Sequence, residues 1–313
     1  ISCNITPEYL EDFLEKNSVT AVYVTSPDYL GNILDIESIA KVCDSFNVPL
    51  LVDNAHGAYL RFLDESIHPI NLGAYMCCDS AHKTVPVLTG GAYLHLSEKA
   101  AMLTNKAESM LSLFASTSPS YMVLQSLDIC NSYLSDTVSE RLEHVAGLVE
   151  NAKKELIGIG YVLSGNEPLK LTVDIIKSGL NKDEILSALR KFNIVPEYYD
   201  NDYIVFMFST ESSEKDSKTL VKALSSLKLS TSQPNIKTAE KRCYGKKAMS
   251  IRAAFFSDKE KVPVSDAVGK ICADVSVGCP PAIPVTVCGE IITEDAVDIM
   301  LCAGINKIEI VAE

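Results

Sequence analysis

Four short apolar runs in the first third of the chain constrain its fold more than any other feature. They occupy residues 20–27, 49–53, 74–80 and 91–96. The runs read as apolar throughout rather than alternating, which is typical of strands buried on both faces of a mostly parallel sheet. A segment of helical pattern at 7–16 leads into the first run, and another at 35–46 separates the first run from the second. Thr6-Pro7-Glu8 forms a typical helix start. The sequence therefore predicts an α/β fold whose mostly parallel sheet has helices on both faces.

Polar residues follow two of these runs. Asp53 ends the second run and His56 comes just after it, while Ser80, His82 and Lys83 follow the third. Ligands of such sheets bind outside the carboxyl ends of the strands, so we expect one shared site. Pyridoxal 5′-phosphate (PLP) needs a carboxylate for its pyridinium nitrogen, a lysine for a Schiff base and small donors for its phosphate. The pattern therefore predicts a PLP site.

Each of these residues also has a purely structural interpretation. Lys83 taken alone would be a solvated surface lysine, and Asp53 a loop acid. His56 could be a core histidine with one satisfied nitrogen, and Ser80 and His82 could cap a turn. The lysine and the acid about thirty residues apart, each at a strand end, favour the cofactor site.

Composition excludes several classes of protein. The chain has 313 residues, of which 47% are apolar and 22% charged, so we expect a globular protein of two domains. A net charge of −13 argues against a nucleic-acid partner and suits a cationic substrate, although acidic surfaces also simply favour solubility. No apolar run reaches the ~18 residues that predict a membrane-spanning helix.

Cysteine and histidine positions predict neither disulfides nor a metal site. The ten cysteines are scattered without a CxxC pair. His68, His95 and His144 are dispersed along the sequence, and no role is assigned to them. Free buried thiols in a reducing cytoplasm are the expectation.

The sequence pattern changes from Gly158 onward. Helical segments at 98–113 and 120–156 precede short strands and helices, which we expect at 170–176, 181–192, 203–208 and 213–227. Residues 229–247 read as a polar connection, and we expect two more strands, a Pro-rich turn and a helix within 266–311. We expect a large domain over 1–150 and a smaller α+β domain over 151–313.

Five segments together carry a family resemblance. They read, in order, VDNAHGAYL, DSAHKTVPVLTGGAYLHL, STSPSYMVLQSLD, NIVPEYYDNDYIVFMFS and CPPAIPVTVCGEIIT. From about residue 5 to its end the chain resembles the Orn/Lys/Arg decarboxylases of PLP fold type I, the aspartate-aminotransferase-like fold, in their short bacterial form. The resemblance implies that Lys83 carries PLP as a Schiff base, that Asp53 pairs with the ring nitrogen and that His56 lies next to the ring. Ser80 and His82 would contact the phosphate.

Further assignments rest on the same resemblance. Thr117 would reach the phosphate of a neighbouring subunit, which implies a homodimer with shared active sites. Glu197 would meet the distal cation of a basic amino acid, and Asn193 replaces the family's glycine four residues before it. Lys83 or His82 would return a proton to Cα after CO₂ leaves.

The resemblance lacks one part. The family's N-terminal segment holds its phosphate loop and the histidine that stacks on the ring. This segment has no counterpart in the 313 residues of the sequence. We therefore expect residues 1–150 to form the C-terminal part of the PLP-binding domain.

Three functions stay open from the sequence. The first is decarboxylation of arginine, lysine or ornithine, with arginine slightly favoured, to give an amine of the polyamine pathway. The second is an aminotransferase or lyase of the same fold; Arg252 is the only candidate in the last 70 residues for a clamp on the substrate's α-carboxylate. The third is a catalytically incomplete fragment.

Overall fold

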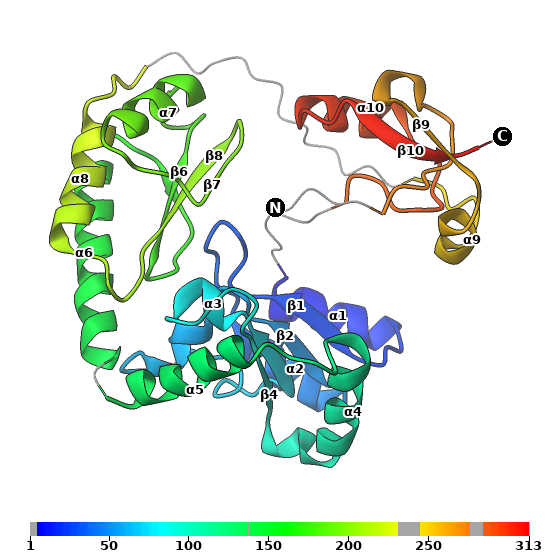
Figure 1. Cartoon of the computed structure of the whole chain (residues 1–313), viewed down its shortest axis with the longest axis horizontal. Coiled ribbons are helices and arrows are strands. Elements are labelled where there is room, and N and C mark those ends of the chain that lie inside the picture. The colour runs from blue at the N-terminus through cyan, green and yellow to red at the C-terminus, as the bar shows by residue number, and fades with distance from the viewer. Residues whose placement is uncertain (1–4, 137, 231–244, 276–283, 313) are drawn as a thin grey trace. The chain divides into compact units, whose positions relative to one another are not determined.

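The chain divides into two compact units, Ile1–Gln233 and Pro234–Glu313 (Figure 1). The structure is a computed structural model and describes residues 5–136, 138–230, 245–275 and 284–312. Across these ranges, no helix combines the length and the apolar character needed to cross a membrane.

The first unit begins with a four-stranded sheet. Its strands, in sheet order, are β1 (Val22–Thr25), β2 (Leu50–Asp53), β3 (Met76–Asp79) and β4 (Tyr93–Leu96). β1, β2 and β3 pair in parallel, and β4 pairs antiparallel with β3. The four predicted strands and the mostly parallel sheet are therefore confirmed.

Two helices cover one face of this sheet. They are α1 (Pro7–Lys16) and α2 (Ile36–Ser45), which lie where the sequence predicts them. The Thr6 hydroxyl caps α1 by accepting from the backbone N–H of Tyr9 at 3.2 Å. The apolar sides of both helices pack on β1–β3 in a buried cluster that includes Val24, Val52 and Cys77. This packing holds the strand ends in place.

The opposite face is incompletely covered. On β1, the side chain of Tyr23 is 62% exposed. An apolar groove on this face is lined by Met76, Leu94 and Met110. The helix beside it, α4 (Thr104–Phe114), has no buried residue. The expectation of helices packed over both faces is therefore wrong for this face in the described part of the chain.

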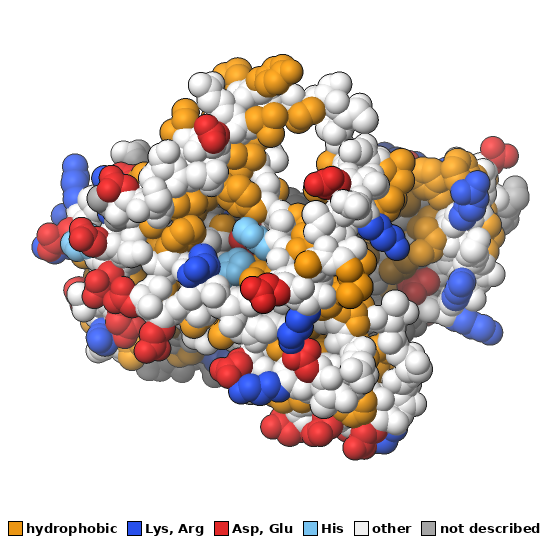
Figure 2. Space-filling view, turned by 90° about the horizontal axis from the view of Figure 1, so that it is seen from below, with side chains coloured by type: hydrophobic (Ala, Val, Ile, Leu, Met, Phe, Trp, Pro, Cys, Tyr) orange, Lys and Arg blue, Asp and Glu red, His pale blue; other side chains and the backbone are white. Residues whose placement is uncertain are grey.

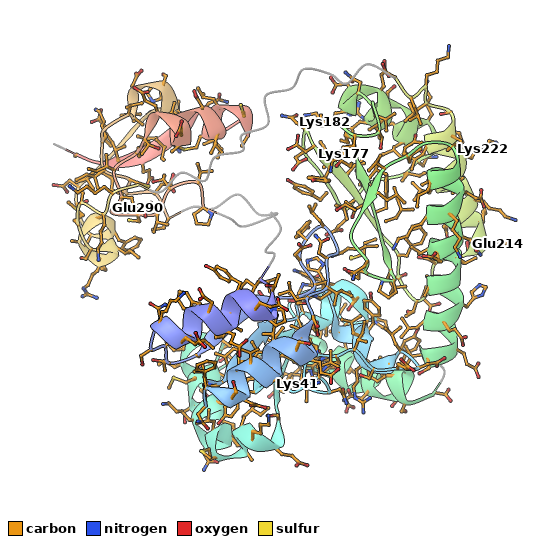
Figure 3. All side chains as sticks on the ribbon, turned by 180° about the vertical axis from the view of Figure 1, so that it is seen from behind. Lys41, Lys177, Lys182, Glu214, Lys222 and Glu290 are labelled. Atoms are coloured by element: carbon orange, nitrogen blue, oxygen red, sulfur yellow. The ribbon has the colours of Figure 1, made fainter. Side chains whose placement is uncertain are left out.

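A second sheet follows in the same unit. Its strands, in sheet order, are β5 (Leu163–Ser164), β6 (Lys170–Asp174), β8 (Tyr203–Met207) and β7 (Tyr198–Tyr199), all antiparallel. Its helices are α5 (Tyr121–Asp136), α6 (Val138–Gly158), α7 (Lys182–Lys191) and α8 (Glu214–Ser225). Charged ends such as those of Glu214 and Lys222 project from α8 (Figure 3). α6 runs through the predicted boundary at residue 150, which stays a prediction.

The second unit is small. It contains α9 (Ile251–Phe255), β9 (Lys259–Pro263), α10 (Glu294–Cys302) and β10 (Lys307–Val311). β9 and β10 pair antiparallel around the buried side chains of Val262, Ile308 and Ile310. β9 was not predicted, because three of its five residues are charged. Residues 231–244 of the connection predicted at 229–247, and residues 279–283 of the family segment CPPAIPVTVCGEIIT, lie outside the described residues.

Candidate active site

Lys83 lies in α3 (Ala81–Thr84), a single helical turn directly after β3. Its backbone N–H donates to the carbonyl of Ser80 at 2.9 Å, so the turn fixes Lys83 at the carboxyl end of the sheet. The half-buried ammonium lies 3.3 Å from Nε2 of His56. The predicted lysine and histidine are therefore in direct contact.

His56 is neutral in this setting. Its side chain is 3% exposed, and burial, with the nearby charges of Lys170 and Lys83, lowers its pKa to about 2. A lysine ammonium only donates, so His56 Nε2 accepts and the ring proton sits on Nδ1. Nδ1 is buried with no hydrogen-bond partner among the described residues, and neither has the hydroxyl of Thr84. Such orphaned groups suit a ligand that satisfies them.

Asp53 is the last residue of β2 and is half-buried. Its Oδ1 accepts from the backbone N–H of Ala55 at 3.1 Å, and its Oδ2 from the hydroxyl of Tyr23 at 3.3 Å. Burial and the charge of Asp53 raise the pKa of Tyr23 to about 12, so Tyr23 stays a donor. The Asp53 carboxylate is thus oriented and still accessible.

Ser80 and His82 flank the same turn. Ser80 occupies the N-cap position of α3, but its side chain does not cap the helix. Nδ1 of His82 lies 3.0 Å from the carbonyl of Gly91, so it must carry a proton and donate. Nε2 is therefore the nitrogen of His82 that can exchange a proton. Both side chains are half-buried.

Three other predicted residues belong to other segments of the chain. Glu197 is exposed just before β7, and the hydroxyl of Tyr29 donates to its Oε1 at 2.9 Å. The ring of Tyr29 lies edge-on to His56 with centroids 4.9 Å apart, so Tyr29 connects Glu197 to the site. Thr117 is not brought to these residues: it is exposed in the turn between α4 and α5. Arg252 lies in the second unit, 5.3 Å from the ring centroid of Phe256.

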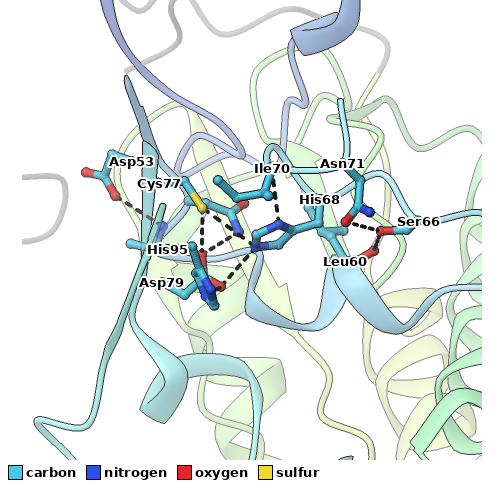
Figure 4. A network of polar contacts seen from close by, with 11 residues as sticks. Asp53, Leu60, Ser66, His68, Ile70, Asn71, Cys77, Asp79 and His95 are labelled. Carbon is cyan, nitrogen blue, oxygen red and sulfur yellow. Dashed lines mark hydrogen bonds and ion pairs between the residues drawn. The ribbon is translucent and has the colours of Figure 1, made fainter. Parts of the chain in front are cut away.

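A buried network behind the site was missed from the sequence (Figure 4). Asp79 ends β3, and its Oδ2 accepts from Nε2 of His68 at 3.0 Å and Nε2 of His95 at 2.9 Å. Its Oδ1 accepts from the side-chain amide of Asn54 at 2.7 Å. Burial alone would raise the pKa of Asp79, but these hydrogen bonds outweigh it and hold the pKa well below its usual range.

This network also has the composition of a metal site. The ligand atoms of His68, Asp79 and His95 lie within 4.8 Å of one another. However, the backbone N–H of Ile70 donates to Nδ1 of His68 at 3.3 Å, which leaves the ring proton on Nε2, facing Asp79. The geometry therefore favours hydrogen bonding over coordination. The register of β3 and β4 places His95 opposite Cys77, two residues before Asp79. Pairing of these two predicted strands could therefore have suggested the contact between His95 and Asp79.

Comparison with known proteins gives the family. Residues 4–160 match the family model of the Orn/Lys/Arg decarboxylase major domain. The chain is 31% identical over 314 residues to an arginine decarboxylase of Bacillus subtilis, and 30% identical over 321 residues to one of Halalkalibacterium halodurans. Both alignments cover 94% of this chain and 64% of the relative, so the chain spans less than two thirds of these proteins' length.

Solved structures agree in fold. The lysine decarboxylase of Francisella novicida aligns with a TM-score of 0.72 at 16% identity, covering 97% of this chain and 60% of the other. The constitutive lysine decarboxylase of E. coli aligns with a TM-score of 0.71 at 15% identity, with the same coverage. This likeness confirms the predicted aspartate-aminotransferase-like α/β fold. The chain belongs to the Orn/Lys/Arg decarboxylase family.

Proposed function

We propose that this chain forms the catalytic part of a PLP-dependent decarboxylase of a basic amino acid, with arginine favoured over lysine and ornithine. The contact between the Lys83 amine and neutral His56 at a strand end carries the proposal. Family membership supports it. The product would be an amine of the polyamine pathway, made in the cytoplasm.

The residues present fit PLP. Lys83 would hold the cofactor covalently, and Asp53 would pair with its ring nitrogen. The orphaned Nδ1–H of His56 would donate to an oxygen of the cofactor, while Ser80 and His82 would contact the phosphate. When bound, the protonated ring supplies an electron sink for the charge left at Cα as CO₂ departs.

The chain's own groups would then manage the protons. Neutral His56 accepts from the Lys83 ammonium at Nε2, and this contact orients the amine. After CO₂ leaves, Cα needs one proton, which the Lys83 ammonium or Nε2 of His82 would supply. His82 is suited to this because its Nδ1 is already committed to the Gly91 carbonyl.

Covalent capture tests the site. The protein is mixed with PLP and reduced with borohydride, and the modified peptide is identified by mass spectrometry. We expect the adduct on Lys83, its loss in Lys83→Ala, and its retention in Lys41→Ala, an α2 lysine paired with Glu37 on the surface (Figure 3). An adduct that persists in Lys83→Ala would reject the assignment. The product separates the reactions: an amine indicates decarboxylation and a keto acid transamination.

Glu197 would pair with the distal cation of the substrate. A buried cation without a partner is unfavourable by several kcal/mol, so the far end of the substrate needs an acid. We expect Glu197→Gln to raise KM by about ten- to a hundredfold, or ~1.5–3 kcal/mol. An unchanged KM for every basic amino acid would remove Glu197 from the site.

A homodimer would complete the site through the turn that holds Thr117. Large apolar side chains around this turn are well exposed: Leu113 68%, Phe114 81%, Tyr121 86% and Met122 70%. Figure 2 shows hydrophobic side chains at the surface in several places on one side of the molecule. Exposed apolar patches of this kind mark protein interfaces. The proposed occupant is a second copy of the chain, because the family places Thr117 in a neighbour's site.

Mixed subunits test the dimer. Lys83→Ala and Thr117→Ala each lack one half of a shared site, so a mixed dimer should regain one intact site. We expect activity above both parents, together with a sedimentation mass of two chains. No gain over the parents would show that each site is self-contained.

A further inference from the structure

Tyr29 is held in place from several sides. Its hydroxyl donates to Glu197 Oε1 at 2.9 Å, and its ring lies edge-on to His56 and to Tyr198, with centroids 4.9 and 5.3 Å away. The ammonium of Lys170 lies 5.8 Å from the ring centroid, within the range of a cation–π contact. An aromatic side chain fixed in this way has a defined position relative to both Lys83 and Glu197.

The loop that carries Tyr29 is fastened to the second sheet. The hydroxyl of Thr172 donates to the carbonyl of Leu30 at 2.8 Å. The carbonyl of Gly31 accepts from the backbone N–H groups of Asn166 and Glu167 at 2.8 and 2.9 Å. These bonds join the strand end of the first sheet to the sheet that also positions Glu197.

Close backbone approach makes the fastening tight. A Cβ at Gly165 would lie 2.4 Å from the Leu30 carbonyl, and the φ of Gly165 is +79°. Only glycine meets both conditions without a shift of the loop. The position of Tyr29 therefore depends on this contact.

A buried ion pair adds a second fastening. Nζ of Lys170 lies 3.0 Å from Oε2 of Glu167 and 3.3 Å from the carbonyl of Asp28, to which it donates. The hydroxyl of Tyr59 donates to Oε1 of Glu167 at 3.2 Å. Both charged side chains are at most 1% exposed. Buried ion pairs add little net stability. This one holds the Tyr29 loop because Lys170 donates to the carbonyl of Asp28, the residue just before Tyr29.

We propose that Tyr29 determines substrate specificity by fixing the carboxylate of Glu197 beside two aromatic rings, an arrangement that selects a guanidinium over an ammonium. The inference rests on the proposed function. Contacts run from Lys83 through His56 and Tyr29 to Glu197, so Tyr29 links the reactive amine to the acid.

The chemistry of the two cations explains the selection. A guanidinium is planar, binds both oxygens of a carboxylate and stacks on aromatic faces, whereas an ammonium is a compact and strongly hydrated charge. The Tyr29 hydrogen bond orients Glu197. A carboxylate has about four acceptor sites, so Glu197 can still accept a bidentate pair of hydrogen bonds from a guanidinium. Tyr29 and Tyr198 supply the aromatic surfaces. Tyr29 is thus a positioning residue with a direct effect on substrate choice.

Binding and turnover with Tyr29→Phe test the proposal. The PLP-loaded protein is titrated in a calorimeter with the amines left by decarboxylation of arginine and of lysine, and KM and kcat are measured with both amino acids. We expect Tyr29→Phe to weaken guanidinium binding and raise KM for arginine about tenfold, with a smaller change for lysine and kcat within about twofold. Tyr199→Phe, at the exposed neighbour of Tyr198, is the matched control and should leave both constants unchanged.

The outcomes separate the two proposals. If the wild type converts a basic amino acid and Tyr29→Phe keeps the same preference for arginine, the role of Tyr29 is rejected and the decarboxylase proposal stands. If the wild type neither binds these amines nor converts the amino acids, both proposals are rejected. Equal losses for both ligands would show that Tyr29 is merely structural and would also overturn its role in selection.

Discussion

Two neighbouring strands end in carboxylates with opposite surroundings. Asp79, at the end of β3, is 3% exposed and accepts from His68, His95 and Asn54. Asp53, at the end of β2, is half-buried and accepts from one backbone N–H and one exposed tyrosine. A carboxylate whose acceptor sites are occupied by the protein's own buried donors stabilises the fold, whereas a carboxylate with unoccupied acceptor sites can bind a ligand. From this difference we expect Asp79 to serve stability, and it supports the proposed role of Asp53 in the chemistry.

The largest expected effect tests the first half of this comparison. Asp79→Ala would leave the donors of His68 and Asn54 buried without an acceptor and would remove the partner of the partly exposed His95. We expect the free energy of unfolding to fall by about 3–5 kcal/mol, measured by denaturant titration. Asp79→Asn keeps one acceptor oxygen and should lose less. A loss under ~1 kcal/mol for Asp79→Ala would show that the network is not structural.

Asp53→Asn tests the other half. An amide cannot keep a pyridinium nitrogen protonated, so we expect turnover to fall by about a hundredfold or more, with part of the cofactor retained. Unfolding free energy should change by less than ~1 kcal/mol, because both hydrogen bonds to Asp53 involve partly exposed groups. Near-normal turnover would contradict the role in chemistry, and a large stability loss would erase the contrast with Asp79.

The smallest effect concerns pH. His56 has its pKa lowered to about 2 in the folded protein, while an unfolded histidine titrates near ~6.5. Between these values only the unfolded chain gains the proton, so stability is lost as pH falls below ~6.5, by at most ~1.4 kcal/mol per pH unit. In protein prepared without PLP, His56→Gln should reduce this slope between pH 6.5 and 5. His144→Gln, at an exposed position, serves as the control.

Local patterns in the sequence predicted much of the fold. The apolar runs, the Thr6-Pro7 cap and the helix at 36–45 depend on neighbouring residues, and the structure confirms them. One expectation failed and one strand was missed, both for the same reason. The open face at Tyr23 and the charged strand β9 depend on what lies opposite them in space, which a local pattern does not contain.

The contacts of the candidate site also separate into those that the sequence predicts and those that it does not. The contact of Lys83 with His56 could be expected because both follow ends of strands in one sheet. The Tyr29–Glu197 contact could not, since it joins two different sheets across 168 positions of the sequence. The Asp79 network was missed although its histidines lie only 11 and 16 positions away. His95 reaches Asp79 through strand pairing, and Glu197 reaches Tyr29 through the second sheet.

Gly165 has a consequence for how substrate preference could change among related proteins. A methyl group there collides with the Leu30 carbonyl, and the loop that holds Tyr29 has to move. On the proposed role of Tyr29, preference among basic amino acids would then shift without any change in a residue that touches the reacting atoms. A substitution in the scaffold, away from the reacting atoms, would thus change substrate choice. Related sequences that differ at this glycine are expected to show altered selectivity.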